Sequence, residues 1–185
     1  MSPRFKLVLL LLFFVFPIAA AFVAYQWFQP QGHVNYGTLI QPAHPLAQTK
    51  FQGSNGAQYD FNRRGKWILL VADSGSCNAR CREKIYLMRQ IRLAQGREMD
   101  RIECVWLVDD KERPTAEMLK LHADGVILTG AEQSVLREFP AERSYRDHIY
   151  LIDPLGNLMM RFPVNPDPQG VQKDIKRLLK VSRIG

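Results

Sequence analysis

The first long apolar run lies near the N-terminus. Residues Leu7 to Tyr25 carry no charge and are almost wholly apolar, so as a helix they can cross a hydrocarbon core of about 30 Å. Arg4 and Lys6 precede this run, whereas the next charge after it is Lys50. Because flanking cations stay in the cytoplasm, the asymmetry predicts a single-pass anchor in the inner (plasma) membrane. Its N-terminus would be cytoplasmic, with the C-terminal domain on the exported, periplasmic side.

A cleaved signal peptide is the alternative interpretation of the same run. Ala19-Ala20-Ala21 offers the small side chains that signal peptidase requires, and Pro17 can kink the helix. The run is long for a signal peptide, which favours a retained anchor over residues 1–28. The sequence leaves cleavage open.

The next segment, residues 29–50, predicts a linker. It is rich in proline and has no charge before Lys50, as in extended tethers that hold a domain away from a membrane. Within it, residues 35–40 can form either a strand that docks on the domain or a lid over it. The pattern does not decide between the two.

From Phe51 to the C-terminus, strand and helix patterns alternate. The predicted strands are 58–61, 66–72, 102–108, 126–128, 148–152 and 158–162, the last two joined by a hairpin at 153–157. The predicted helices are 79–94, 114–121, 132–137 and 171–181. Alternating strands and helices followed by a hairpin and a terminal helix predict an α/β, thioredoxin-like domain over residues 51–185. Its sheet would be covered on both faces.

Two cysteines follow the strand 66–72 at the start of a predicted helix. Cys77 and Cys81 are separated by three residues, about one helical turn. Unpaired N–H groups and the helix dipole favour a thiolate at this position. Such a pair can close a disulfide or bind a soft ion such as Cu(I), and a permanent structural disulfide is the competing interpretation. Cys104 lies in the apolar stretch 102–108 and is predicted to pack as a small buried side chain.

Composition narrows the classes of partner. The chain has 185 residues, of which 46% are hydrophobic and 23% charged, and a net charge of +7, so a folded domain is expected. The basic residues do not alternate with aromatic ones as in nucleic-acid surfaces, so no nucleic acid is expected as a partner. A solvated basic face is the simplest interpretation, and a surface for an acidic partner or anionic lipid is the alternative.

Several stretches, in order, carry a resemblance to one family. They are Gly65-Lys66, the pair Cys77 and Cys81, residues 108–115, Leu128-Thr129-Gly130 and Tyr150-Leu151-Ile152-Asp153-Pro154. They resemble the Sco (synthesis of cytochrome oxidase) family of membrane-anchored thioredoxin-like proteins. Those proteins are implicated in delivering copper, or reducing equivalents, to the copper site of cytochrome oxidase. The resemblance spans roughly residues 51–181.

The resemblance implies a site and a partner. Cys77 and Cys81 would act as the catalytic dithiol, as two ligands of Cu(I), or as both, and the partner would be a cytochrome oxidase subunit that carries a copper site. The family's third copper ligand is a histidine, but Tyr145 stands at its position. His148 is the candidate replacement, although its odd offset along the strand would turn it to the opposite face unless the preceding loop is shortened or bulged.

Other departures keep three functions open. Asn78 and Arg82 stand where the family places prolines, and His33 and His44 lie in the linker as weaker ligand candidates. The chain is therefore expected to be a Sco-like oxidase assembly factor that binds Cu(I) or exchanges disulfides. The alternatives are a copper-independent thiol–disulfide oxidoreductase and a non-catalytic thioredoxin-like scaffold.

Overall fold

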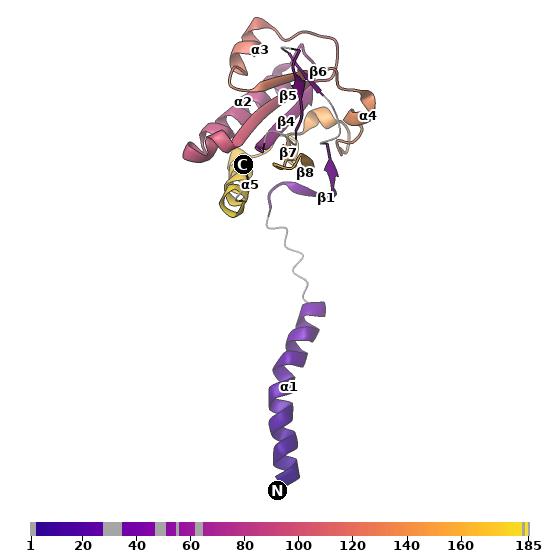
Figure 1. Cartoon of the computed structure of the whole chain (residues 1–185), viewed down its shortest axis with the longest axis vertical. Coiled ribbons are helices and arrows are strands. Elements are labelled where there is room, and N and C mark those ends of the chain that lie inside the picture. Colours follow the sequence, from indigo (N-terminus) through magenta and orange to yellow (C-terminus); the bar gives the residue numbers. More distant parts are fainter. Residues whose placement is uncertain are drawn as a thin grey trace. The chain divides into compact units, whose positions relative to one another are not determined.

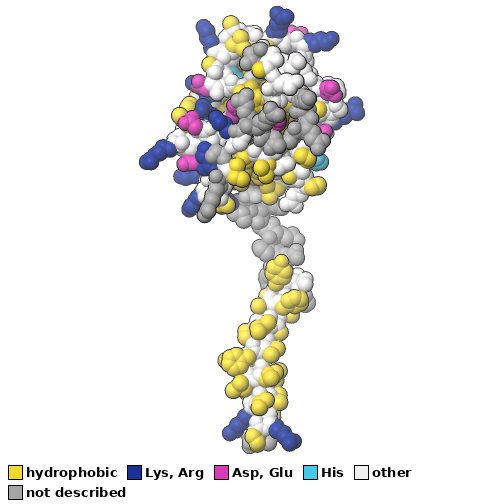
Figure 2. Space-filling view, in the orientation of Figure 1, with side chains coloured by type: hydrophobic (Ala, Val, Ile, Leu, Met, Phe, Trp, Pro, Cys, Tyr) yellow, Lys and Arg dark blue, Asp and Glu magenta, His cyan; other side chains and the backbone are white. Residues whose placement is uncertain are grey.

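The computed structural model describes residues 3–27, 35–46, 51–54, 56–61, 65–182 and 184, and it divides into two compact units, Met1–Val34 and Asn35–Gly185. The first unit holds helix α1, Pro3–Trp27, which continues through Pro17 (Figure 1). Its segment Pro3–Gln26 is long enough to cross a membrane and contains an 18-residue stretch with a mean hydropathy of 2.9. Figure 2 shows apolar side chains along this helix, with cationic ones at its N-terminal end. The predicted apolar helix is therefore confirmed.

The second unit is built on one mixed sheet of eight strands within the described residues, ordered β1-β8-β7-β4-β5-β6-β2-β3. The strands are β1 (Thr38–Pro45), β2 (Phe51–Gly53), β3 (Gln58–Tyr59), β4 (Trp67–Asp73), β5 (Ile102–Val108), β6 (Val126–Thr129), β7 (Tyr150–Ile152) and β8 (Asn157–Arg161). The helices are α2 (Ala79–Leu93), η1 (Gly96–Arg101), α3 (Ala116–Leu121), α4 (Gln133–Leu136), η2 (Tyr145–Asp147) and α5 (Pro168–Val181). The strands β4, β5 and β6 run parallel, and β7 and β8 form the predicted antiparallel hairpin.

Both faces of the sheet are covered, as β4 shows. Alternate residues of this strand enter two different cores because successive side chains point to opposite faces. Leu69 and Val71 pack with buried residues of α2, α3 and α5, whereas Ile68 and Leu70 pack with buried residues of α4. A strand that is buried on both faces has a continuous run of apolar residues in its sequence, as β4 does. The predicted thioredoxin-like α/β fold is confirmed.

The segment expected as a linker differs from the prediction on its domain side. Residues 38–45 form strand β1, which pairs antiparallel with β8, and Leu46 is fully buried and donates its N–H to the carbonyl of Gly156. Residues 35–46 thus belong to the second unit, with a docking strand rather than a lid. The prolines of this segment did not predict a strand, because proline is rare in sheets except on edge strands. β1 is such an edge strand. Residues 29–34 and 47–50 lie outside the described residues.

The first residues of the second unit contact helix α5 and the residue before it. The Tyr36 hydroxyl accepts a hydrogen bond from the Asp167 N–H at 2.7 Å, and the Gly37 N–H donates to the buried Asp174 carboxylate at 2.8 Å. The Tyr36 ring lies so close to Gly170 that a Cβ there would be 2.5 Å from it. The chain therefore enters the folded unit fixed to the N-terminal half of α5.

Candidate redox site

The junction between β4 and α2 places the two cysteines. Strand β4 ends at Asp73, and α2 starts at Ala79 after Asn78, whose side chain accepts a hydrogen bond from the Cys81 N–H at 3.1 Å. This cap fixes the first turn of the helix. Cys77 just before the cap has a φ of 42°, a left-handed conformation that is uncommon for a residue with a side chain. Both cysteines therefore lie at the helix start, as predicted.

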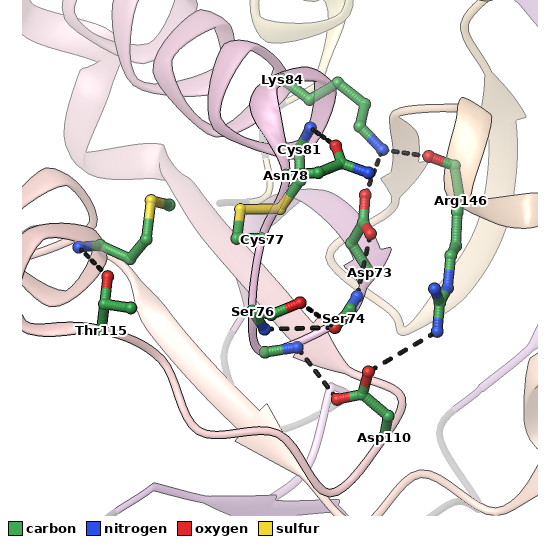
Figure 3. Close-up of a disulfide and its surroundings, with 12 residues drawn as sticks. Asp73, Ser74, Ser76, Cys77, Asn78, Cys81, Lys84, Asp110, Thr115 and Arg146 are labelled. Atoms are coloured by element: carbon green, nitrogen blue, oxygen red, sulfur yellow. Dashed lines mark hydrogen bonds and ion pairs between the residues drawn. A yellow bond between two sulfur atoms is a disulfide. The ribbon is translucent and has the colours of Figure 1, made fainter.

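Cys77 and Cys81 are joined in a disulfide (Figure 3), with their Cα atoms 5.1 Å apart. Cys81 is fully buried in the core beneath α2, whereas Cys77 keeps 4% of its surface exposed. An attacking thiolate therefore reaches Cys77 first. The structure shows the oxidised form of the pair, in which each sulfur is bonded to the other.

The loop before Cys77 is clamped to the loop after β5. The Gly75 N–H donates to the Asp110 carboxylate at 3.0 Å, and the Glu112 N–H donates to the same oxygen at 3.1 Å. Burial raises the pKa of Asp110, but hydrogen bonds from Ser74, Gly75 and Glu112 and the charge of Arg146 outweigh it, so that this pKa lies below its ordinary value. Asp110 is therefore an acceptor that holds the loop of the redox site in place.

Gly75→Ala is expected to destabilise the fold by about 1–3 kcal/mol, the usual cost of overpacking. An added Cβ would lie 1.9 Å from the backbone carbonyl oxygen of Glu112, so one loop must move and take Cys77 with it. Urea unfolding of the full chain in detergent micelles measures the change. Ser76→Ala, one residue on and exposed, is the matched control and should cost little. Equal stability of Gly75→Ala and the wild type would show that the two loops are not tightly packed.

A buried ion pair lies under the first turns of α2. The Lys84 ammonium contacts the Asp73 carboxylate at 2.8 Å and also donates to the backbone carbonyl of Arg146. Lys84 and Asp73 are only 8% and 4% exposed, and the second Asp73 oxygen accepts the Ser74 N–H at 2.9 Å. The pair thus ties α2 to the end of β4 and to η2.

A second ion pair joins η2 to the end of β5. The Arg146 guanidinium binds both oxygens of Asp109, whose side chain is fully buried, at 2.7 Å each. The hydrogen bond to Asp109 raises the pKa of Arg146. Burial, followed by a hydrogen bond with Asp109, raises the pKa of Tyr145. Tyr145 and Arg146 thus bind a carboxylate at the place where the resemblance implied a metal ligand.

His148 lies in the core, 3% exposed. Its Nδ1 is 2.8 Å from the carbonyl oxygen of Phe162, and its ring meets the Tyr150 ring edge-on at 6.0 Å. Because a carbonyl only accepts, Nδ1 carries the proton, and Nε2 is the nitrogen that remains as an acceptor. His148 also lines a cavity of about 230 Å³ together with Arg80 and Asn165.

The structure brings the two cysteines together but does not add His148 to them. Within the described part of the chain, no three His, Cys, Asp or Glu side chains are arranged to hold a metal ion. His44 is exposed on β1, and His33 lies outside the described residues. His148 as a third copper ligand stays a prediction.

The third cysteine, Cys104, is buried in the core as predicted, with 4% of its surface exposed. Burial raises its pKa from 9.0 to about 12, so the thiol stays protonated in the fold. Above pH 9.0 the unfolded chain would lose this proton first, and Cys104 therefore lowers stability as the pH rises further.

Iodoacetamide at about pH 8 is expected to label Cys77 after reduction and to leave Cys104 unlabelled in the folded protein, because only a thiolate reacts. Mass spectrometry of the peptides measures this. The same protein unfolded in guanidinium is the control and should be labelled at all three cysteines. Labelling of Cys104 in the folded protein as fast as Cys77 would contradict the buried thiol.

Sequence reasoning missed Lys84 and Arg146. Lys84 lies on the same face of α2 as Cys81, Ile85 and Met88, all of which are buried. A charge on an apolar helix face requires a buried partner, and that signal was present in the sequence. Nothing comparable identified Arg146, because its partner Asp109 is 37 residues away in the chain.

The fold and the site define a thioredoxin-fold protein with a disulfide at a helix start and an N-terminal apolar helix. The chain belongs to the family described as transmembrane-like, thioredoxin-like, C-terminal domain, whose model matches residues 67–182. The search of curated proteins found no match.

Solved structures share the fold at low sequence identity. Yeast Sco1 with copper bound is 16% identical, covers 82% of this chain and 96% of its own length, and has a TM-score of 0.60. Bradyrhizobium japonicum ScoI with copper bound is 19% identical, with coverages of 69% and 95% and a TM-score of 0.53. The thioredoxin domain of a Bacteroides vulgatus thiol-disulfide oxidoreductase is 15% identical, with coverages of 79% and 99% and a TM-score of 0.51. The resemblance to Sco proteins is therefore confirmed for the fold.

Proposed function

We propose that this chain is a membrane-anchored assembly factor for a respiratory cytochrome oxidase that works by thiol–disulfide exchange at Cys77 and Cys81. The disulfide at the first turn of α2 carries this proposal. The client is inferred from the fold: one structural neighbour, BsSco, is described as a Sco-family cytochrome c oxidase assembly protein with a disulfide switch. A domain on the exported side of the membrane would meet such a client where disulfides persist.

The exchange takes two steps. In the reduced protein, the Cys77 thiolate attacks one sulfur of a client disulfide, forming a mixed disulfide and releasing one client thiolate, which takes up a proton. The Cys81 thiolate then attacks the Cys77 sulfur and releases the second client thiolate. Two electrons pass from the dithiol to the client, and the disulfide seen in the structure is regenerated. Cys77 is the entry point because it is the less buried sulfur.

The carboxylates of Asp73 and Asp109, near the site, hold the backbone in place and do not take part in the exchange. Asp73 is held by Lys84, and Asp109 by Arg146. The two ion pairs fix the end of β4, where the loop with Cys77 starts, and the end of β5, where the loop packed against it starts. Proton exchange with the client thiolates is therefore assigned to solvent rather than to these carboxylates.

Copper handling is the second candidate, supported by the proximity of Cys77 and Cys81. After reduction, two thiolates at Cys77 and Cys81 suit Cu(I), the soft ion that thiolates select. Nε2 of His148 would be the third donor if η2 and the start of β7 rearranged toward the cysteines. The copper-bound structures of yeast and Bradyrhizobium Sco proteins share this fold. Copper would be the cargo passed to the oxidase.

An anaerobic Cu(I) titration of the reduced full chain tests this second candidate. One tightly bound ion, lost in both Cys77→Ser and His148→Ala, would support it. Retention of the ion in His148→Ala would remove His148 from the ligand set. The absence of tight binding in the wild type would contradict copper handling altogether.

Oxidase assembly in cells tests the main proposal. Cells that lack the chain are complemented with the wild type, Cys77→Ser, Cys81→Ser or the matched control Cys104→Ser. We expect Cys77→Ser and Cys81→Ser to lose oxidase activity and to leave the cysteines of the oxidase copper subunit oxidised. Cys104→Ser should behave as the wild type because this cysteine is free and takes no part in the disulfide. Normal oxidase activity without Cys77 and Cys81 would instead indicate a non-catalytic scaffold.

A further inference from the structure

The C-terminal helix α5 has two opposite faces. One face is buried in the core through Val171, Ile175 and Leu179. The other is exposed and carries Lys173, Lys176, Arg177 and Lys180. These residues are spaced at i, i+3, i+4 and i+7, so they share one side of the helix. We call this exposed side the α5 basic face. Figure 2 shows cationic side chains on the side of the domain where Figure 1 places α5, as well as at its top.

Among the described residues, the charges of the three lysines on this face are not neutralised by ion pairs. The only acidic residue of α5 is Asp174, which is buried and accepts the Gly37 N–H. In the part of the chain that the structure describes, Lys173, Lys176 and Lys180 take part in no ion pair. A solvated helix surface usually mixes both signs of charge, whereas a face of one sign fits an anionic partner.

Apolar side chains adjoin the α5 basic face at its C-terminal end. Val181 is 78% exposed and Ile184 is 54% exposed. Cations with exposed apolar groups beside them suit a lipid surface, where the cations meet headgroups and the apolar groups enter the interface.

The chain's own anchor favours lipid over an acidic protein as the occupant. The first unit is a helix that can cross a membrane, and the tether from it enters the second unit at Asn35. The first contacts made after this entry point, by Tyr36 and Gly37, are with α5 itself. A surface beside a tether's entry point meets the anchoring membrane at a high effective concentration, without a second partner.

We propose that the α5 basic face docks on the headgroups of anionic phospholipids. Each cation near such a surface favours docking about fivefold, so the three lysines together suffice for a specific orientation. The attraction is electrostatic and is screened by salt. Because α2 packs against α5, docking would fix the direction in which the redox site faces its client. The docking does not depend on the proposed exchange chemistry.

Lysine acetylation with a neutral reagent tests the docking without any label at the cysteines. The full chain is placed in nanodiscs of phosphatidylcholine alone or mixed with phosphatidylglycerol, and mass spectrometry measures the rate at each lysine. Lys111 and Lys120 are exposed elsewhere on the domain and serve as internal controls. We expect acetylation of Lys173, Lys176 and Lys180 to slow by about fivefold or more in anionic discs, relative to the controls, and high salt to restore it.

A charge-reversed pair of variants makes the test sharper. Lys176→Glu should abolish the protection of Lys173 and Lys180, whereas Lys111→Glu, the same change on another surface, should not. Equal acetylation rates in neutral and anionic discs would overturn the proposal. Protection in native membranes without protection in anionic discs would also overturn it and assign the face to an acidic protein.

Discussion

Replacing Cys81 by serine is expected to stop the exchange reaction halfway. Cys77 would still attack a client disulfide, but the mixed disulfide would lack the neighbouring thiolate that resolves it. Because an intramolecular attack is replaced by a bimolecular one, resolution should slow by at least about 10³-fold. The mixed disulfide should therefore accumulate, and non-reducing gels followed by mass spectrometry of the cross-linked peptide would detect it.

The variant Cys77→Ser tests which of the two cysteines attacks the client. Cys81 is fully buried, so without Cys77 no mixed disulfide should form in the folded protein. Cys104→Ser leaves the pair intact and should exchange at the wild-type rate. Trapping through Cys81 in the Cys77→Ser variant would reverse the assigned roles of the two cysteines.

Lys84→Met is expected to have the largest effect on stability. The substitution removes the ammonium and leaves the Asp73 carboxylate buried without its counter-charge. Breaking one side of a buried ion pair typically costs about 3–5 kcal/mol. Urea unfolding of the full chain in detergent micelles, followed by tryptophan fluorescence, should show this loss.

Two further variants identify the cause of the stability loss in Lys84→Met. Lys120→Met removes an exposed lysine and should change the free energy of unfolding by no more than about 0.5 kcal/mol. The double variant Asp73→Asn/Lys84→Met leaves no buried charge and should recover part of the loss. A loss below about 1 kcal/mol in Lys84→Met would mean that water or another group replaces the ammonium.

Most of the fold could be predicted from local patterns. The continuous apolar runs of β4 and β5, the spacing of Cys81, Ile85 and Met88 on α2 and the turn at Asp153 all act over a few residues. One exception depends on a distant partner: strand β1 exists because β8 offers it an edge. Another is local: α5 starts at Pro168 rather than 171 because Asp167 caps it.

The candidate site was only half predictable for the same reason. The two cysteines share one loop and one helix turn, so their proximity follows from their spacing. The ion pairs around them join residues 11 and 37 positions apart, and no periodicity reports such contacts. His122, next to the end of α3, is 4% exposed because its ring turns inward to the carbonyl of Val126, a contact that the sequence pattern does not report.

An equilibrium redox titration of the full chain in nanodiscs tests the central claim most directly. The protein is equilibrated with glutathione or dithiothreitol buffers, and the thiols are counted by mass spectrometry, with Cys77→Ser as the control that lacks the couple. The exchange mechanism predicts one reversible two-electron transition of Cys77 and Cys81 with a midpoint above about −300 mV. A midpoint well below that value would contradict it, because such a disulfide resists reduction and would serve only as a structural cross-link.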